Sequence, residues 1–529
     1  MSVSNESAHP SADKQGTLGN PMKFKGQDFE LLRNLCLISG YRFRDGIFPS
    51  NMDSIGPDLL TAEELSRVEW VRPGSQHKNP HLFVHGVSRF DIHQGKVGNC
   101  WFLAALGSLT FVPRIMNNVI PSGQGFTQKY VGIFHFRFWR FGKWMDIVID
   151  DKLPTLDGRY LFVGPANGNE FWPALLEKAY AKVCGSYSDL HSGLISEALV
   201  DFTGGVHISF NLTKPREDLW EIMQRAAAHE SLMGSGSHSE PGVKPVNTVL
   251  KNGLVQAHAY AVTGVNMVHC GNKNVKLVRL WNPWGNTEWN GSWSDKMAME
   301  DFTANFTQID ICNVYPHFLD SGNDCIWAMS EHNGSWIKGT SAGGSLKEDT
   351  FWKNPQYRVN LKTAHLDCSS STSFNFVVYL MQKLANKHRK QSLRLHIGFS
   401  IFKVGRMFFI ISRAGSFVQR YRHYASVRED PGSCPPSACV WISSPCVDAP
   451  ACGNRERYNN NNDFCNLKYR PVFYETWTNN SLSHEHRAQE MPSRAILKRT
   501  IKHTSQNRVY ITLPVALSTA LLRRYNTTF

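Results

Sequence analysis

The segment that most constrains the fold is CWFLAALGSL at residues 100–109, which carries no charged side chain and follows Gly98 and Asn99. This pattern predicts an apolar helix that starts sharply at Cys100. Such a helix needs a core around it. The composition supplies one, with 42% apolar and 19% charged residues, 31 Phe, 15 Trp and 16 Tyr. A disordered polypeptide has much less surface to bury, so the chain is globular.

The pattern of hydrophobic spacing changes at the pair Gly204 and Gly205. The chain has 529 residues, whereas ordinary domains have about 100–200, so two or three folded units are expected. Helix and strand signals alternate before the glycine pair and short strands dominate after it, which predicts a hinge there. Helices are expected at residues 29–36 and 170–182, and strands at 130–139, 143–150, 206–212, 257–263, 276–281, 356–361 and 373–380.

The formal net charge of +13 is distributed unevenly along the chain. From Lys383 onward there are 23 Lys and Arg against 8 Asp and Glu, whereas residues 1–382 contain 34 against 36. The first three quarters are therefore nearly neutral. A basic last quarter leaves nucleic acid, an anionic membrane or acidic partners open.

Targeting and cysteine patterns favour an intracellular protein. The N-terminus lacks a basic start followed by an apolar stretch, and Ser2 stands where myristoylation requires glycine. The weakly polar run at residues 509–522 is shorter than the ~20 residues of a membrane-spanning helix. Twelve cysteines without CxxC pairs favour neither a zinc ribbon nor a disulfide framework. The expected localisation is cytoplasmic.

Cys100 is a candidate nucleophile because of its position at the first turn of the apolar helix. The positive end of a helix lowers a thiol pKa and favours the thiolate. Gln94, six residues earlier, can direct its amide N–H at an oxyanion beside the Cys100 N–H. The alternative is an inert core thiol, which is the usual state of a cysteine.

A nucleophilic cysteine also needs a base and a group that orients the base. His258 lies on an apolar strand, where a histidine is usually a hydrogen-bonded core residue. Asn282 precedes a proline, which usually marks a simple turn. However, the order Gln, Cys, His, Asn, with about 150 residues or more between Cys and His, is typical of papain-like proteases.

Several longer motifs strengthen this interpretation, and with them the sequence resembles the calpain family of calcium-dependent, intracellular, papain-like cysteine proteases. The likeness covers about residues 22–405, and it favours an unconventional member without the EF-hand domain. No EF-hand-mediated dimerisation is expected. The matching stretches are residues 94–109, 130–139, 148–154, 170–182, 201–205, 258–260 and 282–285.

The resemblance implies an α+β fold, with a papain-like core of two subdomains followed by a partial β-sandwich. After about Arg406 the sequence leaves the family pattern. This favours either a divergent architecture or an alternative product with a skipped segment and a foreign tail. The expected parts are a disordered arm at 1–21, subdomain 1 at 22–204, subdomain 2 at 205–318, the sandwich at 319–405 and a basic tail of unassigned fold at 406–529.

The resemblance also implies roles for the site residues. Cys100 would be the nucleophile, His258 the base and acid, Asn282 the group that orients the imidazole, and Gln94 an oxyanion donor. Trp284 matches the tryptophan that keeps the subdomains apart when calcium is absent; the alternative is an ordinary core aromatic.

Two calcium sites are implied, one in each subdomain. In the first, Val84 and Gly86 would donate carbonyl oxygens, and Asp91 and Glu170 would donate carboxylates, all of them ligand types that Ca²⁺ prefers. The alternative for this pair is two solvated surface charges.

The second site begins with Glu288 and Asp295, but the acidic loop that follows in the family has no counterpart here. Arg89 thereby lacks its family partner. Glu300 or Asp301 could substitute for the missing acids, but the spacing does not indicate it. Weakening of this site is therefore expected.

Three smaller departures from the family pattern lie beside the candidate catalytic residues. Asn99 replaces an aspartate, Ala257 a glycine and Trp281 an arginine. Alanine at a position of positive φ costs roughly 1 kcal/mol or more.

The sequence therefore predicts a Ca²⁺-dependent cysteine endopeptidase that cuts protein substrates by limited proteolysis. The alternative is a catalytically impaired, calpain-like binding or scaffold protein, owing to the missing loop after Asp295. A third hypothesis is binding through the basic tail. Nucleic acid is not expected as a partner, and peripheral membrane association through the sandwich or the tail stays open.

Overall fold

The computed structural model contains two units, and each has its own core. The first comprises the described residues up to 319 together with residues 388–390, and the second comprises the other described residues from 326 onward. The described residues are 15–166, 168–238, 248–285, 287–293, 296–319, 326–345, 348–359, 373–375, 377–383, 388–390, 396–404, 407–415, 424–428, 438–443 and 507–515.

The first unit mixes helices with short sheets. Its helices are α1 Phe29–Ser39, α2 Met52–Ile55, α3 Ala62–Ser66, α4 Pro73–Gln76, α5 Cys100–Leu109, α6 Pro113–Val119, α7 Trp172–Cys184, α8 Ile195–Thr203, α9 Leu219–Ala228 and α10 Met299–Asn305. Its strands are β1 Met22–Lys23, β2 Val68–Val71, β3 Ile133–Arg140, β4 Lys143–Asp150, β5 Leu153–Leu156, β6 Arg159–Tyr160, β7 Val206–Asn211, β8 Leu232–Ser237, β9 Ala259–Cys270, β10 Lys273–Trp281, β11 Lys296–Ala298 and β12 Phe306–Asn313.

The first half of this unit, residues 15–203, packs helices against the β3–β4 hairpin. The expected helices at 29–36, 100–109 and 170–182 are confirmed as α1, α5 and α7, and the hairpin confirms the two expected strands. Aromatic rings fill the centre, where Phe102 stacks on Tyr180 at 4.5 Å between ring centroids and Phe138 meets Tyr180 edge-on at 5.1 Å. Such pairs add directional contacts to the burial of their large apolar surfaces.

Lysines of α7 are buried and neutralised within this half. Lys178 contacts Asp150 at 2.5 Å and Lys182 contacts Asp45 at 2.6 Å, with all four side chains almost fully enclosed. A buried ammonium group without such a partner would be strongly destabilising. The pairs therefore fix α7 against β4 and against the segment that follows α1.

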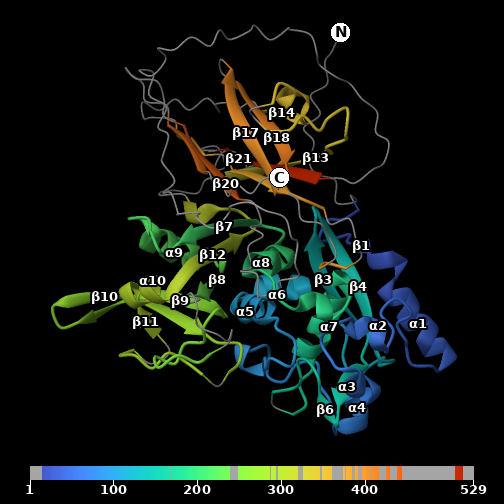
Figure 1. The fold of residues 1–529 in the computed structure, drawn as a ribbon. Helices are drawn as coiled ribbons and strands as arrows, with labels where there is room; N and C mark the ends of the chain where they lie inside the picture. Colours follow the sequence, from blue (N-terminus) through green and yellow to red (C-terminus); the bar gives the residue numbers. More distant parts are fainter. Residues whose placement is uncertain are drawn as a thin grey trace, which may run out of the picture. The chain divides into compact units, whose positions relative to one another are not determined.

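The second half, residues 206–319, is built on a sheet whose described strands run in the order β11-β10-β9-β8-β12-β7. Helices α5 and α8 lie between this sheet and the β3–β4 pair (Figure 1). Contact with α5 is close, since a Cβ built on Gly107 would lie 2.4 Å from the Trp281 ring. Gly204 ends α8 with a φ of 66°, a conformation that favours glycine. The backbone of Gly205 lies against the Asn313 carbonyl, where a side chain would not fit. The glycine pair therefore allows both the end of the helix and the close approach of strand β12.

The described part of the second unit is built mainly of strands, with one short 3-10 helix at Phe351–Lys353. The strands are β13 Ile326–Gly334, β14 Gln356–Val359, β15 Ser373–Asn375, β16 Val377–Met381, β17 His396–Val404, β18 Met407–Gly415, β19 Tyr424–Arg428, β20 Ala438–Ser443 and β21 Asn507–Val515. They form two sheets, with orders β13-β21-β16-β20-β19-β15 and β14-β18-β17.

The boundary predicted at residue 405 is too early. It falls inside an antiparallel hairpin, because β17 pairs with β18 along its whole length. Strand β21, within the expected tail, pairs with both β13 and β16. Strand pairing between residues so far apart in sequence has no local signal, so the sequence alone predicts no fold beyond about Arg406.

The other end of the chain also differs from expectation. Residues 15–21 were expected to belong to a disordered arm, but the Gly16 carbonyl accepts a hydrogen bond of 2.9 Å from the Trp144 N–H of β4. Residues 1–14 lie outside the described residues. Among the described helices, none combines the length and apolar character that a membrane crossing requires.

Residues 388–390, expected within the sandwich, instead pack on the first unit. The buried Arg389 guanidinium donates to the carbonyls of Asp189 and Ser192, at 3.1 and 2.8 Å, and pairs with Glu197 at 2.8 Å. It also lies 4.7 Å from the Trp101 ring centroid. This segment therefore braces the loop between α7 and α8, next to the start of α5.

Candidate active site

The start of α5 is held by residues from other elements. Asn99, at the N-cap, donates to Glu177 of α7 at 2.6 Å between Nδ2 and Oε1, while the other Glu177 oxygen accepts the Val163 N–H at 2.9 Å. Burial raises the pKa of Glu177 to about 8, against the opposing effect of these two hydrogen bonds. Cys100 is thus the first residue of a helix whose origin is fixed in the core.

His258 and Asn282 form a buried hydrogen-bonded pair. The distance from His258 Nε2 to Asn282 Oδ1 is 2.8 Å, and the two residues are 2% and 0% exposed. Ser237 of β8 anchors the His258 backbone, because its hydroxyl accepts the His258 N–H at 2.9 Å. The Trp284 ring lies 4.8 Å from the imidazole, and the Trp284 N–H donates to Asn282 Oδ1 at 3.1 Å.

The neighbours of Asn282 decide the tautomer of His258. The Asn282 amide NH₂ donates to the carbonyl and hydroxyl of Thr287, at 2.8 and 2.7 Å, so the amide oxygen must face the imidazole. An amide oxygen only accepts hydrogen bonds, and His258 Nε2 therefore carries the proton. The other nitrogen, Nδ1, is buried without a hydrogen-bond partner among the described residues and keeps its basic lone pair.

Cys100 lies close to the start of strand β9, which directly follows His258. The backbone N–H of Ala259, the residue after His258, approaches the thiol and stabilises its ionised form, as do the N–H groups of Trp101 and Cys100 itself. No hydrogen bond joins Cys100 to His258 in the part of the chain that is described. The structure thus brings nucleophile and base candidates together although 158 positions separate them.

The electrostatics of this arrangement differ from the sequence expectation. Burial raises the pKa of the Cys100 thiol, and this outweighs the stabilising helix N–H groups that were expected to lower it. Burial also lowers the pKa of His258 to about 4, although the bond to Asn282 opposes the shift. Both groups are therefore neutral at neutral pH in this structure.

Gln94 lies near the start of α5. Its Nε2 donates to the Val97 carbonyl at 3.0 Å, and its Oε1 is buried without a partner among the described residues. The Gln94 side-chain amide is thus held at Val97, three residues before Cys100. One of its two N–H groups makes this hydrogen bond. This leaves the second N–H as a donor for a group at Cys100.

Asp91 and Glu170 form a buried carboxylate pair. They are 6% and 2% exposed, and the Trp172 indole N–H donates to Asp91 at 3.2 Å. Burial raises the pKa of both carboxyl groups, to about 7 for Glu170, where the nearby Asp91 adds to the effect. The loop with Val84 and Gly86 is tied to the pair, since the Val84 N–H donates to Glu170 at 2.9 Å.

This geometry fits the first expected calcium site. Two carboxylates that disfavour each other's charge are what a cation would stabilise, and backbone carbonyls of the tied loop could complete an oxygen shell. Among the described residues no cluster of three or more His, Cys, Asp or Glu side chains occurs. Any site here must therefore rely on carbonyl oxygens as well as side chains.

The second expected site is described only in part. Glu288 lies close enough to Tyr260 to raise the pKa of that phenol, although burial is the larger cause. Asp295 lies outside the described residues. Glu300 and Asp301 are exposed in the first turn of α10, and the Arg89 guanidinium lies over the rings of Phe90 and Phe111, at 4.3 and 5.2 Å.

Two of the departures noted in the sequence have structural consequences. Ala257 adopts a φ of 52°, the left-handed conformation for which glycine is suited. Trp281 is buried against Gly107 of α5, so the position taken by arginine in the family here forms an apolar contact between the two halves.

Sequence reasoning missed the residues that position the site. Glu177 holds Asn99, Ser237 holds the His258 backbone and Thr287 orients Asn282. Only Thr287, five residues after Asn282, lies near enough in the chain to be noticed. The others join the site through pairing of elements that are distant in sequence.

These features define a cysteine-protease core followed by a β-sandwich. Residues 43–299 match the family profile described as calpain family cysteine protease, and residues 332–428 match calpain large subunit, domain III. The chain belongs to the calpain family. The second match runs past the predicted limit at residue 405 and agrees with the pairing of β17 and β18.

Individual relatives agree with this assignment. Human calpain-14 is 40% identical over 408 residues, which is 72% of this chain and 59% of the relative. The calpain-1 catalytic subunit of mouse is 40% identical over 429 residues, covering 74% and 60%, and rat calpain-8 is 38% identical over 427 residues, also covering 74% and 60%. The chain thus spans about three fifths of the length of these relatives.

Proposed function

We propose that this chain is a Ca²⁺-dependent cysteine endopeptidase that cleaves cytoplasmic protein substrates at a limited number of sites. The observation that carries the proposal is the His258–Asn282 pair, whose Nδ1 has no hydrogen-bond partner among the described residues, while the N–H of the next residue, Ala259, approaches the Cys100 thiol. Papain-like chemistry needs a nucleophile, a base and an orienting amide, and Cys100, His258 and Asn282, remote in sequence, would supply these three groups.

In the first half-reaction, His258 Nδ1 takes the proton from Cys100 Sγ as the sulfur attacks the substrate carbonyl carbon. A C–S bond forms, and the carbonyl oxygen becomes an oxyanion. The Cys100 N–H and the second Gln94 N–H are the donors available to it. Collapse of this intermediate breaks the C–N bond, and the leaving amine takes the proton from Nδ1.

In the second half-reaction, water replaces the amine. His258 Nδ1 accepts a proton from the water, whose oxygen attacks the thioester carbon, and collapse breaks the C–S bond. The proton returns to sulfur, so Cys100 and His258 regain their neutral state. Asn282 keeps the imidazole in one plane throughout, because Thr287 fixes the amide.

Ca²⁺ would be held by Asp91, Glu170 and the carbonyls of Val84 and Gly86. A bound ion would neutralise the two carboxylates and tie the 84–91 loop to the start of α7. Since α5 begins close behind this loop in the chain, ordering it would set the position of Cys100. Trp284, which lies against His258, is the residue proposed to respond as the two halves close.

A second candidate is a calpain-like binding or scaffold protein with impaired catalysis. One observation favours it: Trp293 pairs with Lys296 in a β-bridge, so β11 begins where an acidic loop follows in the family. The second calcium site then lacks the carboxylates of that loop and keeps only Glu288 and Asp295, so calcium would act mainly through the first half.

Digestion of casein with and without millimolar calcium tests the proposal, with the Cys100→Ala chain as control. Calcium-dependent cleavage by the native chain, absent from the control, is expected. Insertion of an acidic loop after Asp295 separates the candidates. Cleavage that appears only after this insertion would favour the scaffold function for the native chain.

A further inference from the structure

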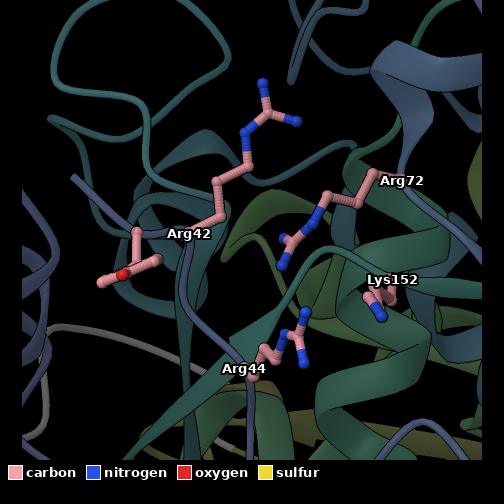
Figure 2. Close-up of a pocket in the computed structure, with 5 residues that line it drawn as sticks. Arg42, Arg44, Arg72 and Lys152 are labelled. Atoms are coloured by element: carbon pink, nitrogen blue, oxygen red, sulfur yellow. The ribbon is translucent and has the colours of Figure 1, made fainter.

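A basic pocket lies in the first half of the first unit, formed by Tyr41, Arg42, Arg44, Arg72 and Lys152. Its volume is about 570 Å³, within the range of small-molecule sites, roughly 300–1,000 Å³. Figure 2 shows the head groups of Arg44, Arg72 and Lys152 directed toward a common space, with Arg42 extending beside it. The residues come from three segments: the stretch after α1, the start of α4 and the end of β4.

The positive charge of this pocket exceeds the negative charge around it. The neighbouring carboxylates are already neutralised, Asp45 by Lys182, Asp150 by Lys178 and Asp151 by Arg72. Among the described residues, Arg42, Arg44 and Lys152 have no carboxylate partner. Arg42 lies over the Tyr130 ring at 5.3 Å, which leaves its N–H donors available.

The backbone that carries these cations is fixed. Arg72 is nearly buried and donates to the Phe43 carbonyl at 2.6 Å, which anchors the backbone between Arg42 and Arg44. The Lys152 N–H donates to Asp150 at 3.1 Å, and its carbonyl accepts from Lys178 at 2.6 Å. Like charges are thus held together on a rigid frame, which costs free energy unless an anion neutralises them.

We propose that this pocket binds a phosphate-bearing anion, either a phosphomonoester or a pyrophosphate group. Planar guanidinium groups match two phosphate oxygens at once, and Lys152 adds a point charge. A carboxylate ligand would neutralise only one of the three unpaired cations, so a multiply charged group fits better. The exposed Tyr41 places a hydroxyl donor at the rim. The ligand could be a soluble metabolite or a lipid headgroup, and this function is independent of proteolysis.

Calorimetric titration of the full chain with inorganic pyrophosphate tests the proposal. The native chain is expected to bind with an affinity that falls as salt rises. Arg44→Gln combined with Lys152→Gln should weaken binding at least tenfold. Arg72 stays in place, because it neutralises Asp151. The matched control is Lys214→Gln with Lys273→Gln, which removes the same charge from exposed positions in the second half and should bind like the native chain.

Vesicles separate the two sources of the phosphate. Phosphatidylcholine vesicles with phosphatidic acid, compared with phosphatidylcholine alone, present the group on a surface. Binding of such vesicles that requires Arg44 and Lys152, without binding of pyrophosphate, would identify a lipid headgroup. Binding of pyrophosphate without a vesicle preference would identify a soluble anion. Either result supports the phosphate site.

A footprint on the native chain avoids dependence on the variants. Pyrophosphate should protect Arg42 and Arg44 from phenylglyoxal, while the exposed Arg114 stays reactive. The proposal is overturned if neither probe binds, if the control pair weakens binding as much as the pocket pair, or if protection is equal at all three arginines. The last two results would assign the affinity to the general basic charge of the chain.

Discussion

The two halves of the first unit carry different parts of the proposed chemistry. The first half holds the nucleophile and a complete carboxylate pair, Asp91 and Glu170, tied to a loop by hydrogen bonds. The second half holds His258 and Asn282 just as firmly, but its strand β11 follows Trp293 almost directly. The residues of the proposed catalytic site and those of the proposed calcium sites can therefore diverge independently within one core.

Buried titratable groups in this unit keep or lose their charge according to their partners. The first half contains ion pairs, such as Lys178 with Asp150, but also Glu177, whose pKa burial raises to about 8. In the second, burial lowers the pKa of His258 to about 4, so the imidazole stays neutral at neutral pH. A paired charge keeps its ionisation when buried, whereas an unpaired histidine gives up its proton.

The largest expected effect concerns this neutral histidine. Its folded pKa of about 4 lies below the usual 6.5, so the unfolded chain binds the proton more readily between these values. His258 therefore contributes stability that is fully present above pH 6.5 and is lost as pH falls toward 4, amounting to about 3 kcal/mol. Urea unfolding of the native chain and of His258→Gln across this window should show the difference in pH slope.

His229→Gln, a substitution of the same type at an exposed position, is the control for this comparison. Equal slopes in the native chain and in His258→Gln would mean that the imidazole is not kept neutral by burial. The distinction between ion-paired and neutral buried groups would then fail.

The contact between the halves gives the next effect. Gly107→Ala places a Cβ 2.4 Å from the Trp281 ring, and overpacking of this kind should cost about 2 kcal/mol after the gain in helix propensity. Trp281→Leu in the same chain should restore most of the loss. Gly236→Ala, whose Cβ would meet nothing closer than 3.9 Å, is the control. Thermal denaturation measures all of these variants, and equal losses at the two glycines would contradict the tight packing.

Calcium ligation compares the halves directly. Glu170→Gln should raise the calcium needed to shift the thermal midpoint at least tenfold, about 1.4 kcal/mol, because it removes one of two carboxylates. The isosteric Glu288→Gln should change the requirement much less, since its half lacks the acidic loop. Equal effects of the two substitutions would show that the second site contributes as much as the first.

The smallest effect tests the backbone before His258. Ala257 has a φ of 52°, so Ala257→Gly should stabilise the protein by about 1 kcal/mol. Ala259→Gly, in strand β9, should instead destabilise it by about 1 kcal/mol, because glycine there only adds unfolded-state entropy and removes a buried methyl group. Unfolding in denaturant distinguishes the two, and a loss of stability in both would show that Ala257 is not strained.

Local patterns predicted the elements that carry the site. Helix α5 has an apolar run with a glycine and a capping position before it, and α7 has helical spacing, so both were predictable to within a few residues. The order of Gln94, Cys100, His258 and Asn282 indicated the chemistry because papain-like spacing is distinctive.

Contacts between distant segments were not predictable. Glu177 reaches Asn99 across 78 positions, and Arg389 reaches Glu197 across 192. Neither leaves a local signal, because each depends on how whole elements pack. The pKa of Cys100 shows the same limit: its helix position was visible in the sequence, but the burial that dominates the shift was not.

The most direct test of the central claim is the alkylation rate of Cys100 by iodoacetamide, measured by peptide mass spectrometry with and without millimolar calcium. Calcium should accelerate labelling of Cys100 selectively over buried Cys184 and exposed Cys270, and His258→Ala should abolish the acceleration. If Cys100 reacts no faster than these thiols in the presence of calcium, the claim that calcium assembles a Cys100–His258–Asn282 protease site is contradicted.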